Sequence, residues 1–209
     1  MLDRLFTKSP LPVSVTKFYI VAQRVSDKRL VPEHRGRNIT VKEVLQAGVE
    51  RMRHPCPRPS HVIDSRYKQS AVCFSAYSED KFAGCIWLTT DKYCEDVVRC
   101  TFSLPDNNSV WDFDAYVDPQ YRISPVFLKL WDYTYGWMRE EGRQWSISRI
   151  SAFNSNSRNV HRRMGATDLG SMVFFRVGRW QFTLSTFKPR LHLSFSKSTA
   201  PVFVVCPPD

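Results

Sequence analysis

Apolar and polar residues alternate along five segments within the first 117 residues, and this spacing predicts β-strands. The segments are Val13–Val25, Gln69–Tyr77, Lys81–Thr90, Val97–Leu104 and Val110–Val117. Turn-forming residues at Ser78–Asp80 separate the second segment from the third and predict a hairpin. The last two segments predict another strand pair, in which Val97–Leu104 is either an insertion or the bent continuation of the preceding strand.

Helical spacing of apolar residues predicts two helices in the same part of the chain and just beyond it. Thr40–Glu43 has the form of a capping box and predicts a helix that ends before Pro55. Ser124 as the N-cap and Pro125 as the first helical residue predict a longer helix that ends near Glu141.

The remainder of the chain predicts a short helix over Ser157–Met164, which ends at Gly165 with a positive φ. The strands predicted around this helix are Ser146–Phe153, Ser171–Val177 and Trp180–Thr186. Residues 187–209 form a C-terminal extension with an apolar patch at Val202–Val205. This patch docks either on the core or on a second subunit, so a homodimer is one of two alternatives.

These elements predict a mixed α/β fold in a single domain over residues 1–209. We expect a central, mostly antiparallel mixed sheet flanked by helices. If Val110–Val117 and Ser146–Phe153 are parallel, the long helix between them is a right-handed crossover. Such a pair can splay at its ends, and an extended ligand would lie in the resulting slot almost as an extra strand.

Composition narrows the class of protein. A chain of 209 residues with 43% hydrophobic content can bury a sizeable core. Its longest apolar runs are too short to predict a membrane span, and its first ten residues do not have the pattern of a secretion signal. A cytoplasmic location is therefore expected. The six cysteines lack Cys-x-x-Cys spacing, so we interpret them as small buried hydrophobic residues rather than metal ligands or disulfides.

The net charge of +10 favours anionic partners. Three kinds of partner fit this sign: a phosphorylated cofactor, an acidic protein, and nucleic acid. Nucleic acid is disfavoured, because the sequence shows no recognition helix, zinc finger or basic tail.

Two segments carry residues that could bind a ligand. The first has Val117 and Pro119 at a strand end, followed by Arg122, Pro125 and Phe127 at the start of the long helix. The second places, in order along the short helix, the residues Asn154, Ser157, His161, Gly165 and Ala166.

Together these two segments resemble the GNAT superfamily of acyl-CoA N-acyltransferases, over roughly residues 70 to 186. The resemblance implies an acyl-CoA or an acyl-phosphopantetheine on a carrier protein as co-substrate, and no metal. It also implies a backbone N–H near Tyr116 or Val117 that holds the thioester oxygen. The residues that would bind the cofactor are Tyr116, Val117, Arg122, Ile123, Ser124, Val126, Phe127, Asn154 and Ser157.

The sequence departs from the family pattern in two places. Pro125 and Phe127 replace the glycines of the phosphate loop, and proline lacks the N–H that would contribute roughly 1.5–3 kcal/mol at a charged acceptor. We expect the amides of Val126 and Phe127 to remain free, so that a weakened anion site survives. His161 stands where the family usually has a tyrosine that acts as general acid.

Catalytic roles are predicted for three side chains. Asp114, with Asp112 second, is the candidate base or amine anchor, because residues two apart on a strand share a face and neighbouring carboxylates can raise one pKa. His161 is the candidate acid for the departing thiolate, since imidazole titrates near neutral pH; the alternative is a surface histidine beside two arginines.

The sequence thus predicts an N-acyltransferase that moves an acyl group from a pantetheine thioester to an amine on a small molecule or peptide. The alternative is a degenerate scaffold of the same fold that serves as a binding or assembly module.

Overall fold

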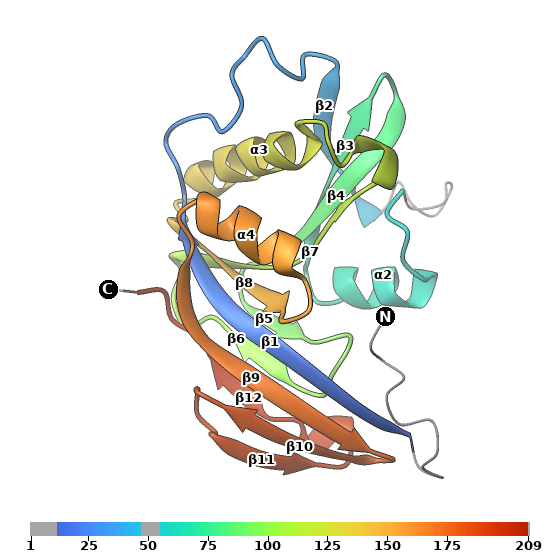
Figure 1. Ribbon diagram of the computed structural model, residues 1–209, viewed down its shortest axis with the longest axis vertical. Coiled ribbons are helices and arrows are strands. Elements are labelled where there is room, and N and C mark those ends of the chain that lie inside the picture. Colours follow the sequence, from blue (N-terminus) through green and yellow to red (C-terminus); the bar gives the residue numbers. More distant parts are fainter. Residues whose placement is uncertain (1–11, 47–54, 209) are drawn as a thin grey trace. The chain divides into compact units, whose positions relative to one another are not determined.

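The computed structural model describes residues 12–46 and 55–208. Contacts between residues group into two compact units, whose elements are labelled in Figure 1. Unit 1 consists of Met1–Gln23, Asp91–Asp106 and Ile147–Asp209, and unit 2 consists of Arg24–Thr90 and Asn107–Ser146. That residues 1–209 act as a single domain stays a prediction.

Unit 2 contains antiparallel strands in the order β7-β4-β3-β2. Their bounds are β2 Ile39–Glu43, β3 Val72–Ser78, β4 Lys81–Thr89 and β7 Ser109–Val117. The hairpin predicted around Ser78–Asp80 is confirmed. It turns at Glu79 and Asp80, whose φ angles are 50° and 63°, in the left-handed region; aspartate tolerates this region better than most residues.

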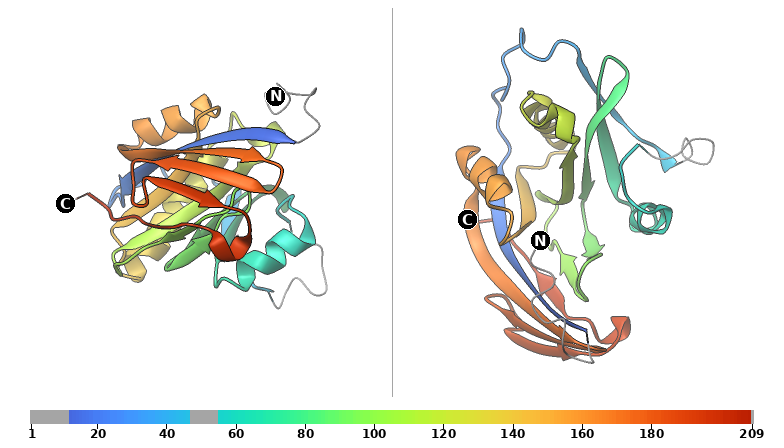
Figure 2. Two further views of the ribbon diagram at one scale, coloured as in Figure 1. Left: turned by 90° about the horizontal axis from the view of Figure 1, so that it is seen from below. Right: turned by 45° about the vertical axis from the view of Figure 1, so that its right-hand side comes forward.

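Two helices lie on opposite faces of the unit 2 strands, α2 (Ser60–Tyr67) and α3 (Val126–Glu140) (Figure 2). The predicted long helix is confirmed as α3, whose buried stripe includes Leu130, Trp131, Thr134 and Met138. Gly142, with a φ of 68°, follows the helix as predicted. The shorter α2 packs through the ring of Tyr67, which meets the Trp87 ring of β4 edge-on at 5.1 Å.

The helix predicted from the capping box is wrong at its start. Thr40 and Glu43 lie in β2, where they pair with Tyr77 and Phe74 of β3. The backbone pairing of a sheet satisfies the same N–H groups that a cap would satisfy, so tertiary pairing prevails over the local signal. The rest of that predicted helix includes residues 47–54, which lie outside the described residues.

Unit 1 is built from two sheets, with strand orders β11-β10-β9-β1-β8 and β12-β6-β5. The strands of the larger sheet are β1 Val13–Arg24, β8 Trp145–Ser151, β9 Thr167–Val177, β10 Trp180–Ser185 and β11 Leu191–Ser194. The strands of the smaller sheet are β5 Lys92–Cys94, β6 Thr101–Ser103 and β12 Val202–Val204. The predicted first strand and the hairpin of β9 and β10, which turns at Gly178, are confirmed.

The strand pair predicted from Val97–Leu104 and Val110–Val117 is wrong. Only residues 101–103 are extended, and β6 pairs with β5 and, in parallel, with β12. The segment therefore does not continue the preceding strand β4, and that it is an insertion stays a prediction. The rings of Phe102 and Phe203 pack at 6.1 Å, so the Val202–Val205 patch docks on the core of unit 1. Within unit 1 the short helix α4 (Ser155–Arg163) also lies over the sheet, with Arg158 above the ring of Tyr19.

The mixed α/β class predicted from the sequence is confirmed: antiparallel pairs such as β1·β9, β9·β10, β3·β4 and β4·β7 occur together with the parallel pair of β6 and β12. Whether Val110–Val117 and Ser146–Phe153 are splayed stays a prediction. Within residues 12–46 and 55–208, no helix has both the length and the apolar character to cross a membrane.

Candidate functional site

The turn between β7 and α3 is a compact, hydrogen-bonded structure. After Val117 the chain enters a 3-10 helix over Pro119–Tyr121, whose first turn is capped by Asp118 through a bond from the Gln120 amide at 3.1 Å. The Asp118 amide in turn donates to the Ala83 carbonyl of β4 at 2.9 Å. The strand end that the sequence predicts as a cofactor contact is thus held against its neighbouring strand.

β4 and β7 also approach each other unusually closely at Gly84. A Cβ atom at this position would stand 2.6 Å from the Tyr116 carbonyl oxygen and 3.3 Å from the Cα of Val117. No side chain fits there, so glycine is required for this register. The backbone near Tyr116 and Val117, where the thioester oxygen is predicted to bind, is therefore fixed by packing on one side.

The start of α3 differs in detail from the sequence prediction. Pro125 is the N-cap and the helix begins at Val126, whereas Ser124 and Pro125 were expected in those positions. The hydroxyl of Ser124 donates to the Tyr121 carbonyl at 2.6 Å and accepts the Val126 amide at 3.3 Å. The expectation that the Val126 amide is free is therefore wrong, because the preceding serine already occupies it.

Phe127 lies half-buried in the first turn of α3, and its ring packs 6.3 Å from the ring of Trp131. By contrast, Arg122 and Ile123 are exposed in the turn before the helix. The turn thus presents one cation near the amino end of a helix of 15 residues, which is where an anion is favoured. It presents fewer backbone donors than a glycine loop would.

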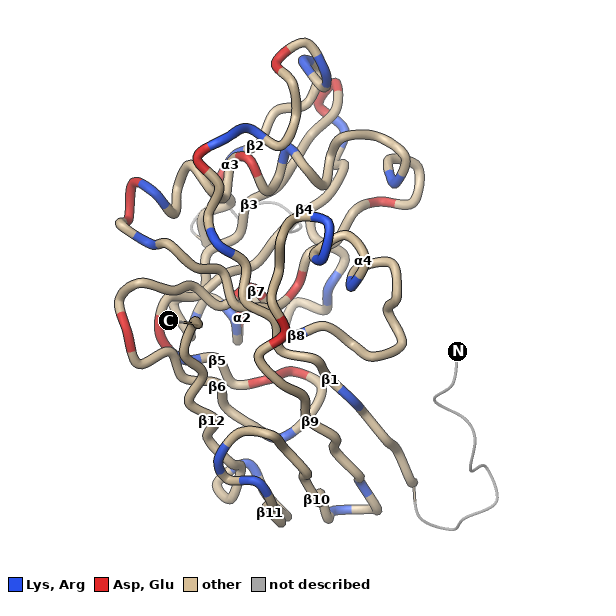
Figure 3. The backbone as a smooth tube through the Cα atoms, turned by 60° about the vertical axis from the view of Figure 1, so that its left-hand side comes forward, with Lys and Arg blue, Asp and Glu red and all other residues tan. Residues whose placement is uncertain are grey.

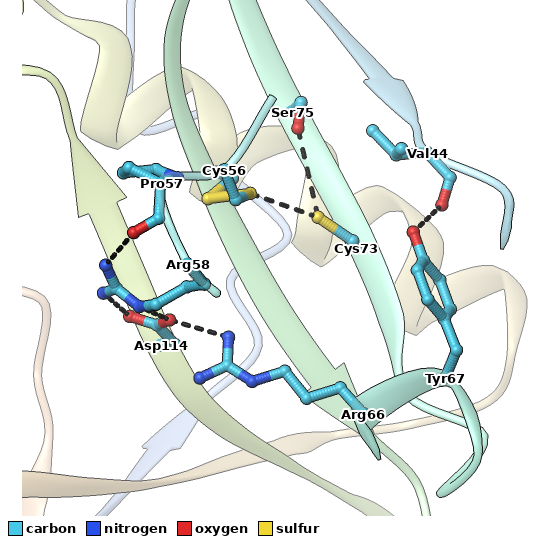
Figure 4. Close-up of a disulfide and its surroundings, with 10 residues drawn as sticks. Val44, Cys56, Pro57, Arg58, Arg66, Tyr67, Cys73, Ser75 and Asp114 are labelled. Carbon is cyan, nitrogen blue, oxygen red and sulfur yellow. Dashed lines mark hydrogen bonds and ion pairs between the residues drawn. A yellow bond between two sulfur atoms is a disulfide. The ribbon is translucent and has the colours of Figure 1, made fainter. Parts of the chain in front are cut away.

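Asp114 is held by two arginines from outside its strand (Figure 4). Arg58 forms a fork, with Nε 2.8 Å from Oδ2 and Nη2 2.6 Å from Oδ1, and Nη1 of Arg66 lies 2.7 Å from Oδ2. Burial by itself raises the pKa of Asp114, but the Arg58 hydrogen bond and the charges of Arg66 and Arg58 outweigh it and leave the pKa below its usual value. This carboxylate is ionised at neutral pH.

The two arginines are themselves fixed by aromatic contacts. The Arg66 side chain is only 4% exposed and its guanidinium lies over the rings of Trp87 and Phe113, at 5.2 and 5.1 Å. Arg58 lies over the ring of Tyr116 at 5.7 Å. An ionised carboxylate gripped in this way is a weak proton acceptor, so the geometry favours a positioning role for Asp114 over the predicted base.

Asp112 and Asp114 do not share a face of the sheet, and that prediction is wrong. Asp114 pairs with Trp87, and Asp112 with Leu88, the next residue of β4. Adjacent residues of a strand point to opposite faces, so Trp87 and Leu88 do, and their partners Asp114 and Asp112 do as well. Phe113 is the extra residue of a β-bulge, which breaks the usual alternation along β7. Asp112 is buried and accepts the hydroxyl of Ser146 at 2.6 Å.

In unit 1 the predicted short helix is confirmed as α4. Asn154 is its N-cap and accepts the Ser157 amide at 3.0 Å, so both residues hold the helix start. Gly165, with a φ of 85°, and Ala166 donate their amides to the carbonyls of Arg162 and His161, which closes the helix end. The helix thus has the capped start and the glycine stop that its sequence predicts.

His161 is buried, with 3% of its surface exposed, while its neighbours Arg162 and Arg163 are exposed. The alternative of a surface histidine is therefore wrong. A role as general acid stays a prediction.

The predicted site residues fall into two groups. The strand, turn and helix start of unit 2 hold Asp112, Asp114, Tyr116, Val117, Arg122, Ile123, Ser124, Val126 and Phe127, and α4 with its cap in unit 1 holds Asn154, Ser157 and His161. Each group comes from one continuous stretch of chain. That the two groups act together on one substrate stays a prediction.

The sequence interpretation missed Arg58 and Arg66. The sequence indicates them only indirectly. A carboxylate buried in a strand requires a cation as its partner, but the sequence does not say which arginine or lysine that is. It also missed a disulfide between Cys56 and Cys85, beside the Cys73 thiol, whose Sγ is 3.6 Å from that of Cys56. The interpretation of all six cysteines as buried hydrophobic residues is wrong, since Cys94 and Cys206 are exposed as well. Spacing could not reveal the disulfide, because its two cysteines are brought together only by the fold.

No family model matches the sequence, and no curated protein matches it. Solved structures do match. A functionally unknown conserved protein from Staphylococcus epidermidis ATCC 12228 superposes with a TM-score of 0.55 at 9% identity, covering 78% of this chain and 62% of that one. A GCN5-related N-acetyltransferase from Sphaerobacter thermophilus gives 0.53 at 14% identity, covering 78% and 52%.

A putative acetyltransferase of the GNAT family from Novosphingobium aromaticivorans DSM 12444 gives a TM-score of 0.51 at 13% identity, covering 78% of this chain and 65% of that one. This chain therefore spans less than two thirds of the length of each of these three proteins. At such identities the likeness establishes the fold. The chain has the GNAT fold, which confirms the resemblance seen in the sequence at that level.

Proposed function

We propose that this chain is an N-acyltransferase that transfers an acyl group from a pantetheine thioester to an amine by direct attack. The observation that supports it most is the strand, turn and helix of residues 109–140 in a chain with the GNAT fold. The strand ends at Val117, a capped turn follows, and a long helix begins at Val126 with Arg122 exposed beside it. A helix start with a nearby cation suits the pyrophosphate of a cofactor.

The donor is an acyl-CoA or an acyl-phosphopantetheine on an acidic carrier protein. Both are anionic, and the net charge of +10 favours both. Arg122, Ile123, Ser124, Val126 and Phe127 would lie at the phosphate end of the donor. Asn154 and Ser157 are the cofactor contacts proposed on α4.

The reaction needs a hydrogen-bond donor to the thioester oxygen, an acid for the leaving thiolate and a base for the amine. A backbone N–H near Tyr116 or Val117 would hold the thioester oxygen as negative charge develops on it. The amine attacks the carbonyl carbon, the C–S bond breaks, and His161 supplies a proton to the departing thiolate. Asp114 would position β7 through its two arginines, which leaves Asp112 as the candidate base that accepts the proton lost by the attacking amine.

Thiol release from an acyl-CoA in the presence of a panel of amines tests this proposal. Arg122→Ala should raise KM for the donor several-fold with kcat little changed, because it removes a contact with a charged group. His161→Ala should lower kcat by 10²- to 10⁴-fold, the usual contribution of a general acid, with donor affinity retained. Arg29→Ala, an exposed arginine elsewhere in unit 2, is the charge-matched control. Unchanged kinetics in both test variants would remove these residues from the mechanism.

A second candidate function is a GNAT-fold binding or assembly module without catalysis. It is favoured by the helix start, where Pro125 has no N–H and Ser124 occupies the amide of Val126. Thermal shift with acetyl-CoA, a long-chain acyl-CoA, free coenzyme A and an acyl carrier protein separates the two functions. Binding to the folded state raises Tm by mass action, so the absence of any shift would favour the module.

A further inference from the structure

One face of the larger sheet in unit 1 is apolar and exposed. Its strands β9, β10 and β11 lie side by side with β1 (Figure 1). The side chains of this face have exposed fractions between 37% and 63%. They are Val15, Phe175, Val177, Trp180, Phe182, Leu184, Leu191, Leu193 and Phe195, and together we name them the apolar face.

The strand register makes the apolar face continuous. Val15 pairs with Phe175, Phe175 with Phe182, and Phe182 with Leu193, so one row of apolar side chains crosses four strands. In the next row the ring of Trp180 meets the ring of Phe195 edge-on at 5.6 Å. Single exposed apolar residues are normal on a protein surface. These side chains instead form a continuous patch, and a patch calls for an explanation.

The opposite face of β10 carries polar residues. Gln181 and Thr183 are fully buried, while Trp180, Phe182 and Leu184 between and beside them are exposed. Gln181 exchanges hydrogen bonds with the backbone of Arg99, at 2.8 and 2.7 Å. A sheet with one solvated face normally shows the reverse, apolar inside and polar outside. The inversion indicates that the outward face of β10 is also covered when the protein functions.

The area of the apolar face matches the requirement for a stable dimer. An aromatic side chain has a full area of roughly 150–250 Å², and with a value near the lower end of that range for every residue the nine expose on the order of 700 Å². That exceeds the patch of about 300–600 Å² that is the largest on a typical monomer. It is close to the roughly 800 Å² that each partner contributes to a standard interface.

We propose that the apolar face is the contact surface of a homodimer, in which two copies of this chain pack face to face about a twofold axis. Such an interface places the same patch on both copies, and an apolar, aromatic surface is the composition that homodimer interfaces favour. Two twisted sheets can pack face to face in this way, with their strand directions within about 30° of each other.

Charges at the rim give the dimer a diagnostic dependence on salt. Arg179 and Arg190 lie in the turns at either end of β10, and Lys17 follows Val15 on β1; Figure 3 shows blue segments and no red ones in those turns. Two copies would bring like charges near each other at the rim, so added salt should strengthen the dimer by screening. An anionic lipid surface, the other occupant that these cations would suit, should instead bind less well in salt.

Sedimentation velocity of the full chain over a wide concentration range tests the proposal. The wild type should sediment as a dimer, and Phe182→Glu, at the centre of the face, should halve the mass with an unchanged circular dichroism spectrum. Val204→Glu is the matched control, since Val204 is an exposed apolar residue of the smaller sheet, and it should remain dimeric.

A wild type that is monomeric throughout, or a dimer that Phe182→Glu does not dissociate, overturns the proposal. Co-sedimentation with vesicles of phosphatidylcholine and phosphatidylserine is the second measurement. If the wild type is monomeric and binds these vesicles, and Phe182→Glu abolishes this binding, the face belongs to a membrane surface instead.

Discussion

The best-defined polar cluster of unit 2 is one carboxylate shared by two arginines. Asp114 uses both oxygens, Arg58 reaches it from the segment before α2, and Arg66 reaches it from α2 itself. Removing one member of a buried ion pair leaves an uncompensated charge, and this costs more than the intact pair contributes. The cluster is therefore one of the contacts that hold the segment containing α2 against β7.

Asp114→Asn should lower the free energy of unfolding by about 3–5 kcal/mol, because it leaves the Arg66 guanidinium buried beside a neutral amide. Urea denaturation at neutral pH measures this change. Asp64→Asn, an exposed position of α2, is the control and should change stability by less than about 0.5 kcal/mol. Equal stability of the two variants would show that the cluster contributes nothing.

The same cluster makes the stability of the folded protein fall when the pH becomes acidic. The pKa of Asp114 is lower in the folded protein than in the unfolded chain, so its contribution is fully present above the unfolded value of about 3.9. The contribution of Asp114 to stability is lost as the pH falls through the pKa of Asp114 in the folded protein, which lies below the unfolded value. A comparison of urea midpoints between pH 7 and pH 3 should therefore show a smaller acid-induced loss in Asp114→Asn than in the wild type.

At the scale of elements, the disulfide ties the segment before α2 to β4. Cys56 and Cys85 are 29 residues apart, and closing a loop of that length contributes about 3–4 kcal/mol in the chain-entropy account. Reduction by dithiothreitol should therefore lower Tm. Titration of the denatured chain should find four thiols before reduction and six afterwards.

Reactivity in the folded state gives the control for this experiment. Burial is the main cause that raises the pKa of the Cys73 thiol to about 12, and burial also raises the pKa of Cys100. Only the exposed Cys94 and Cys206 should react with a thiol reagent at neutral pH in the native protein. Six reactive thiols in the unreduced, denatured chain would contradict the disulfide.

Elements whose signal is local could be predicted from the sequence. The stripe of α3, the cap and glycine stop of α4, and the alternation in β1, β3, β4, β9 and β10 each lie within one short segment. The candidate residues in the turn before α3 and on α4 could likewise be named, because the motifs that carry the resemblance are contiguous. The fold follows from these segments, since their order along the chain restricts the topology.

What could not be predicted depends on residues far apart in the sequence. The bulge at Phe113 arises from pairing with β4, and without it Asp112 and Asp114 would share a face. Likewise β2 is a strand only because β3 lies beside it, and its capping-box sequence would serve a helix equally well. Arg58 and Arg66 have no local pattern that links them to Asp114.

At the scale of the whole molecule, neither compact unit is a continuous stretch of chain. The backbone passes between the units at residues 23–24, 90–91, 106–107 and 146–147. Unit 1 joins three separate segments, and contacts among those segments hold it together. Arg149 binds Glu95 at 2.6 Å, for example, and Arg99 bonds to Ser194 and to the carbonyl of Arg179. A unit assembled from distant segments cannot form before the intervening chain is ordered without a large loop-closure cost.

The chain should therefore unfold in a single cooperative transition, and a lesion in unit 2 should lower the stability of unit 1 equally. In the Asp114→Asn variant, hydrogen exchange of amides in β9 and in β3 should report the same loss of free energy, although only β3 belongs to the damaged unit. Calorimetry gives the second readout, because a two-state transition has equal calorimetric and van't Hoff enthalpies. Protection that falls in β3 and stays unchanged in β9, or two resolved heat peaks, would show that the units are independent domains and would refute the single domain predicted for residues 1–209.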